Sequence, residues 1–181
     1  MKTTIRTLSI ITLILSFSLT LTAQGKSKKE QKKKAKSEKR FENYTKTKEL
    51  IESGNFVFSA DRAFPTGMRS IDLTNNPGYI IFKNDSAEAD LPFFGRSYSA
   101  DYGGNTGIKF RGKIENKDLK YNDKKHRINY AFSVNDKDNF QISMIISDDG
   151  STNITINSSK KNSISYNGKI EKPEDKKNDK K

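Results

Sequence analysis

The residues available for acid–base chemistry are few. His126 is the only histidine of the 181-residue chain, and it lies in the polar stretch NDKKHRIN. A serine or cysteine nucleophile needs such a base within hydrogen-bond reach. The chain has no cysteine, and no serine lies in the G-x-S-x-G pattern of a nucleophile elbow. We therefore expect His126 to be a solvated turn residue, and we assign no catalytic residue.

The carboxylates offer two further kinds of chemistry. Asp136 and Asp138 resemble the start of a calcium-binding loop, but Gln141 stands where that loop needs a glycine. Asp61 and Asp101 could hydrolyse a glycosidic bond only if about 5–10 Å separated them across a cleft, and nothing in the sequence places them so. We expect no metal and no cofactor. Hydrolysis stays an alternative without a visible nucleophile, base and acid.

The stretch LPFFGRSYSADYGGNTG, residues 91–107, is the strongest candidate for a ligand or recognition surface. It combines aromatic rings and an arginine with four glycines, which permit sharp bends. It lacks the Gly-Lys-Ser ending of a phosphate-binding P-loop. Two interpretations stay open: a structural corner where Pro92 ends a strand, and a recognition surface. The candidate residues of that surface are Phe93, Phe94, Arg96, Tyr98 and Tyr102.

The positive charge is concentrated before the predicted domain. The chain carries +12, and residues 24–48 contain eleven Lys or Arg against three acidic residues. Such a segment is attracted to anionic membrane surfaces and to nucleic acid. We do not expect a nucleic-acid partner, because no aromatic or arginine side chains alternate with these lysines to stack on bases. A soluble tether is the alternative to envelope contact. The candidate contact residues are Lys32, Lys33, Lys34 and Lys36.

Composition divides the chain into four parts. Residues 1–23 have a basic start and an apolar run, which predicts a cleaved signal peptide. An uncleaved membrane anchor is the alternative, although the run is shorter than the about 20 apolar residues that span a bilayer. Residues 24–53 are rich in helix-forming Lys, Glu, Gln and Ala, so we expect a helix from about Lys29 to Ser53 that ends at Gly54. Residues 54–170 form the β-domain, and residues 171–181 form a charged tail that we expect to be disordered. Export as a periplasmic or secreted protein follows, and the absence of cysteine excludes a lipoprotein anchor.

The β-domain is predicted from apolar residues that alternate with polar ones. The pattern is clearest over Ile128–Val134 and Phe140–Ile146, with short polar turns between such runs. Consecutive hairpins of this kind form an antiparallel meander. We therefore predict an all-β fold of about eight to ten strands, curled into a barrel or a sandwich. The sequence does not decide between these two, nor does it give the oligomeric state.

The domain resembles a family of exported bacterial proteins, domain-of-unknown-function family 4251. The resemblance covers about Lys46 to Ile170, and its carriers are FVFSADRAFP, LPFFGR with YGG and GIKF, and ISYNGKI. It implies a signal sequence, a charged helical lead-in and an all-β domain. The family has no assigned activity, so the resemblance implies no catalytic residues. Some members carry a lipoprotein cysteine, whose absence here favours a soluble periplasmic or secreted form.

These observations favour a non-catalytic binding or envelope-associated module. An alternative is a carrier of a small apolar ligand in a barrel pocket, because barrels of eight strands can enclose one small ligand. The sequence identifies neither the ligand nor a protein partner.

Overall fold

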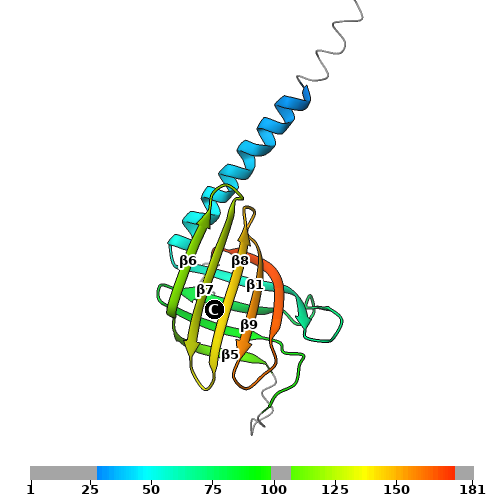
Figure 1. Ribbon diagram of the computed structural model, residues 1–181, viewed down its shortest axis with the longest axis vertical. Helices are drawn as coiled ribbons and strands as arrows, with labels where there is room; N and C mark the ends of the chain where they lie inside the picture. The colour runs from blue at the N-terminus through cyan, green and yellow to red at the C-terminus, as the bar shows by residue number, and fades with distance from the viewer. Residues whose placement is uncertain (1–27, 99–106, 174–181) are drawn as a thin grey trace, which may run out of the picture. The chain divides into compact units, whose positions relative to one another are not determined.

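The computed structural model describes residues 28–98 and 107–173 (Figure 1). The predicted signal peptide, Tyr102 and most of the charged tail lie outside these residues. A helix occupies residues 28–52, close to the predicted bounds. Residues 28–40 and the residues from Phe41 onward belong to two structural units.

Ten antiparallel strands follow the helix and form one nearly closed, barrel-shaped sheet. Neighbours along the chain pair with one another in each half, and β1 pairs with β10 to join the two halves. The predicted all-β meander is therefore confirmed, and the sheet is a nearly closed barrel with β5 and β6 at its edges. The strands are β1 (Asn55–Pro65), β2 (Ile71–Asp72), β3 (Gly78–Lys83), β4 (Ser86–Leu91), β5 (Ile108–Lys113), β6 (Glu115–Asn122), β7 (Arg127–Asn135), β8 (Asn139–Ser147), β9 (Ser151–Ser158) and β10 (Ile164–Glu171).

The two halves of the sheet cross each other. Figure 1 shows β6 to β9 running lengthwise, with β1 and β5 crossing behind them. The chain passes from one half to the other at Ile114, between β5 and β6. Gly112 lets β5 approach β7 closely before this corner, because a Cβ atom there would lie 2.9 Å from Cγ1 of Val134 and 3.2 Å from the Asn135 carbonyl oxygen.

The inward faces of both halves form one core. Aromatic rings stack within it: Phe56 and Phe82 lie 4.1 Å apart, and Phe82 meets Phe132 edge-on at 5.5 Å. Tyr166 and Phe58 are wholly buried. A small apolar ligand inside the barrel would have to displace such rings, so the core gives the predicted carrier function no support.

Two strands differ from the sequence-based interpretation. The alternation of Phe56, Phe58 and Ala60 predicts a first strand that ends at Asp61 and Arg62, but the observed strand is longer. A bulge between Ala60 and Arg62 shifts the pairing with β10, and β1 continues to Pro65. The strand β6 was not predicted, because most of its side chains are polar and exposed. It lies at an edge of the sheet, where polar side chains are expected.

The second half of the helix packs on the barrel. Tyr44, Thr47 and Ile51 are buried. The Tyr44 hydroxyl donates to Oδ1 of Asp123 at 2.8 Å. Burial and this bond raise the pKa of Tyr44. The helix ends at Gly54, whose φ of 66° is left-handed, as predicted for a helix C-cap.

The prediction that His126 is a solvated turn residue is correct only in part, because it lies in the β6–β7 turn but is half-buried. Its ring lies 6.1 Å from that of Phe41 and 5.4 Å from that of Tyr44, so it helps to hold the helix. The sequence could not show this contact, because the helix and the β6–β7 turn lie far apart along the chain.

Candidate functional site

The stretch after β4 forms a closure at the end of the barrel opposite the helix. Pro92 follows the last residue of β4, as predicted. Its carbonyl accepts a hydrogen bond of 2.9 Å from the buried Tyr166 hydroxyl, and burial raises the pKa of Tyr166. Gly78 makes room for this turn, since a Cβ atom there would lie 2.6 Å from Cδ of Pro92.

The same stretch is fastened to the connection between β9 and β10. The Tyr98 amide donates to the Lys160 carbonyl at 2.8 Å, and the Asn162 amide donates to the Arg96 carbonyl at 3.1 Å. The Tyr98 hydroxyl also donates to Oδ1 of Asn162. A structural role for this segment therefore has a physical basis in the backbone bonds.

The predicted recognition residues have different surroundings. Phe93 and Phe94 are both half-buried and pack against the core. Arg96 is exposed, and Tyr98 is 71% exposed. Tyr102 lies outside the described residues. The structure therefore brings the two phenylalanines together with the core and leaves the arginine and Tyr98 at the surface.

Two hollows lie beside this closure. The first, of about 420 Å³, is lined by Phe93 and Phe94 together with Pro77, Tyr79 and Asp90. The second is a groove of about 590 Å³ between β4 and β5 on one side and the β7–β8 and β9–β10 connections on the other. The residues that line both hollows are Tyr79, Asp90, Gly107 and Lys109. The two hollows are therefore contiguous.

Charged side chains dominate the rim of the groove, and its acidic groups are engaged. Arg111 pairs with Glu88, and Lys109 pairs with Asp90 at 3.1 Å. A carboxylate oxygen of Asp136 accepts the backbone amide of Arg111 at 3.2 Å, which caps the edge of β5.

Asp138 is the most firmly held of these carboxylates. It accepts bonds from the Ser158 and Ser159 hydroxyls, and from the Ser159 amide at 3.2 Å. Partial burial alone would raise the pKa of Asp138. The serine hydroxyls and neighbouring amides outweigh that effect and lower it, so the carboxylate stays ionised. These bonds fix the turn of residues 136–138 between β7 and β8.

Lys161 is the unusual residue of the groove. Its side chain lines the groove although the residue is only 9% exposed. Nζ donates to the Gly107 carbonyl at 2.6 Å and lies 5.7 Å from the centre of the Phe93 ring. No carboxylate of the described residues forms an ion pair with it. Buried ammonium groups are normally paired, because removing them from water is costly.

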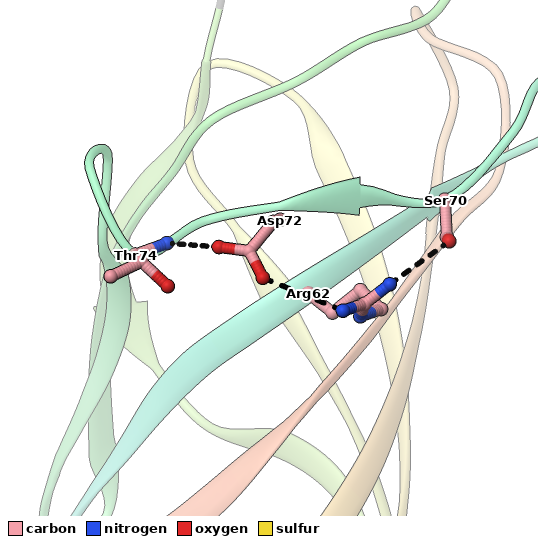
Figure 2. Close-up of polar contacts among 4 residues, drawn as sticks. All are labelled: Arg62, Ser70, Asp72 and Thr74. Atoms are coloured by element: carbon pink, nitrogen blue, oxygen red, sulfur yellow. Dashed lines mark hydrogen bonds and ion pairs between the residues drawn. The ribbon is translucent and has the colours of Figure 1, made fainter.

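A separate polar cluster links β1, which contains the FVFSADRAFP segment, to β2 and the residues beside it (Figure 2). Arg62 lies 3.4 Å from an oxygen of Asp72 and 3.4 Å from the Ser70 hydroxyl. Hydrogen bonds from Thr74, followed by the charge of Arg62, lower the pKa of Asp72. The groups are exposed, so this clasp between β1 and β2 contributes little to stability.

The other predicted residues do not assemble into a reactive site. Lys32, Lys33, Lys34 and Lys36 are exposed on the helix. His126 lies at the β6–β7 turn, at the other end of β7 from the groove. Within residues 28–98 and 107–173, no cluster of three His, Asp or Glu side chains could hold a metal ion. In the same residues, no helix has the length and hydropathy needed to cross a membrane.

Sequence reasoning missed Lys160 and Lys161, which looked like ordinary turn residues. Their place in the groove depends on the pairing of the β9–β10 connection with the stretch after β4, which only the structure shows. The isolated bridge between Ser97 and Lys161 places the β9–β10 connection beside the predicted aromatic stretch. The local sequence carries no signal of this contact.

Comparison with known proteins agrees with the fold. The profile described as "Domain of unknown function (DUF4251)" matches residues 38–170. No curated protein matches the chain. A crystal structure of a DUF4251 family protein from Bacteroides eggerthii DSM 20697 superposes with a TM-score of 0.58 at 17% identity, covering 72% of this chain and 87% of that one. The chain belongs to the DUF4251 family.

Proposed function

We propose that this chain is an exported, non-catalytic binding module that attaches to an anionic envelope surface through its basic helix. The observation that carries the proposal is the separation of charge. Residues 28–40 contain eight Lys or Arg against two Glu, and every one of these residues is exposed. The β-domain, by contrast, is close to neutral: residues 49–170 hold sixteen Lys or Arg and fifteen acidic residues.

The physical basis of attachment is electrostatic. Each lysine close to an anionic membrane contributes about 1 kcal/mol, and the attraction fades within a Debye length. Apolar side chains are nearly absent from residues 28–40, so this part of the helix has no face to bury in the acyl region. Binding should therefore be superficial, reversible and sensitive to salt.

Vesicle sedimentation tests the role of the helix. The full mature chain should bind phosphatidylglycerol vesicles at low salt and phosphatidylcholine vesicles at least about tenfold more weakly. Replacing Lys32, Lys33, Lys34 and Lys36 together by glutamine should weaken binding to the anionic vesicles by at least about tenfold.

A control variant removes the same charge from the barrel. It carries glutamine at Lys83, Lys113, Lys124 and Lys125, which are exposed. If both variants lose binding equally, or if binding is insensitive to salt, the helix is not the attachment site and this part of the proposal fails.

Export is tested separately by fractionating the cells that produce the chain. The apolar run before Ala23 supports cleavage there. The protein should be recovered outside the cytoplasm, and N-terminal sequencing should begin close after Ala23. A cytoplasmic chain that still starts at Met1 would contradict export without bearing on the vesicle result.

A further inference from the structure

We propose that the two contiguous hollows beside the barrel closure form one site for an amphipathic anion, whose carboxylate contacts Lys161 and whose apolar part lies along Tyr79, Phe93 and Phe94. The proposal deepens the proposed function and rests on the chain being a binding module. It assigns the ligand to the outer surface of the barrel end, and the interior of the barrel keeps its packed core.

The anionic end of the site follows from Lys161. An ammonium group has three donors. The Gly107 carbonyl uses one of them, and the Phe93 ring provides a weak electrostatic contact. No described carboxylate balances the charge. A ligand carboxylate in the groove would supply both the missing acceptor and the missing charge.

Neighbouring groups favour an anion at the same place. Lys160 also lines the groove, and its Nζ donates to the Lys137 carbonyl at 2.6 Å. Lys137 lines the groove too. The carboxylates of Glu88 and Asp90 form ion pairs, and those of Asp136 and Asp138, which also line the groove, accept amide and hydroxyl hydrogen bonds. Among the described residues, Lys137, Lys160 and Lys161 form no ion pair, and five cationic side chains line the groove against four carboxylates.

The apolar end follows from the adjoining hollow. Phe93 and Phe94 line it and remain half-buried, so part of each ring stays accessible. Tyr79 is 39% exposed and lines both hollows, which makes a continuous path from the aromatic rings to the lysines. Burial of a ligand's alkyl chain along these rings would be favourable. A groove of about 590 Å³ is within the range of small-molecule sites.

A structural role for Lys161 explains its hydrogen bond to Gly107 but not its positive charge. The bond to the Gly107 carbonyl ties the start of β5 to the β9–β10 connection, and a neutral donor could do the same. A full positive charge is not needed for that bond, whereas it is needed to hold an anion. Ligands that differ only in the charge of their head group therefore distinguish the structural role from the anion-binding role.

The first experiment uses the unaltered mature chain and three probes that share one alkyl chain. Isothermal titration with octanoate, 1-octanol and octylammonium compares negative, neutral and positive head groups. We expect octanoate to bind at least about tenfold more tightly than 1-octanol, and octylammonium to bind most weakly. Equal binding of octanoate and 1-octanol, or no binding of octanoate, overturns the proposal, and neither result depends on the folding of a variant.

The second experiment locates the site. Lys161→Gln keeps a donor for the Gly107 carbonyl and removes the charge, so octanoate binding should weaken at least about tenfold while 1-octanol binding stays the same. Phe94→Ala should weaken both probes. Lys113→Gln is the matched control, because Lys113 is an exposed lysine of β5 that does not line the groove. Octanoate binding that is unchanged in Lys161→Gln overturns the assignment of the head group.

The vesicle assay separates this inference from the proposed attachment. The variant with glutamine at Lys32, Lys33, Lys34 and Lys36 should bind octanoate normally. The Lys161→Gln variant should bind anionic vesicles normally. If Lys161→Gln loses vesicle binding and keeps octanoate binding, the groove recognises a lipid surface and the assignment of a soluble carboxylate is wrong.

Discussion

Replacing Tyr166 by phenylalanine tests how the barrel end is closed. Tyr166 is wholly buried, and its hydroxyl donates to the Pro92 carbonyl at 2.9 Å. The substitution keeps the ring and its packing and removes one bond. A hydrogen bond of this kind contributes about 1 kcal/mol, and leaving the partly buried carbonyl without a donor adds to the loss. We expect the free energy of unfolding to fall by about 1–2 kcal/mol, out of a typical 5–15 kcal/mol.

The loss should also appear locally. The Tyr98 amide donates to the Lys160 carbonyl, and the Asn162 amide donates to the Arg96 carbonyl. These two bonds connect the stretch after β4 to the β9–β10 connection. Hydrogen exchange at these two amides should accelerate by about tenfold, the factor that corresponds to about 1.4 kcal/mol. Urea unfolding should show a lower midpoint with an unchanged m-value, because the surface exposed on unfolding stays the same.

Tyr79→Phe is the matched control. Its side chain is 39% exposed, and its hydroxyl has no hydrogen bond within the described residues. Its effect should stay within about 0.5 kcal/mol. If Tyr166→Phe falls in the same range and leaves exchange at both amides unchanged, the bond to Pro92 does not hold the closure, and the reasoning is refuted.

Three further predictions concern other parts of the barrel. Gly168→Ala should lower the free energy of unfolding by about 3 kcal/mol or more, because a Cβ atom there would lie 2.0 Å from the Ser59 carbonyl oxygen. Urea unfolding measures this loss, and a variant as stable as the original chain would contradict the packing. His126→Ala should lower the free energy of unfolding by about 1 kcal/mol and lower the melting temperature, because it removes two ring contacts to the helix. An unchanged melting temperature would show that the helix does not dock through this ring. Burial and the charge of Asp85 raise the pKa of Tyr130 from 10.0 to about 12, so this residue's contribution to stability is complete below pH 10 and is lost between pH 10 and 12. Circular dichroism and tyrosinate absorbance should show unfolding and ionisation together, and smooth ionisation of all tyrosines near pH 10 would contradict it.

The candidate site was only half predictable. Phe93 and Phe94 stood out because adjacent aromatic residues after a strand-ending proline are unusual. Lys161 did not stand out, because lysine in a polar turn is ordinary, and its burial depends on the bridge to Ser97 across the barrel end. The ring contacts of His126 were missed for the same reason, since Phe41 and Tyr44 belong to the helix.

The sequence by itself determined the class of fold and the division of charge. Alternating apolar residues define strands through local geometry, and the lysines of residues 28–40 are adjacent in the chain, so both features are visible without a structure. Tertiary structure alone decided that the sheet curls into a nearly closed barrel, through the pairing of β1 with β10 and the close approach of β5 to β7 at Gly112. It also decided which lysine is buried. A hairpin turn fixes the register of two strands that are adjacent in the chain, but no turn connects β1 to β10, so their pairing is not visible in any local pattern.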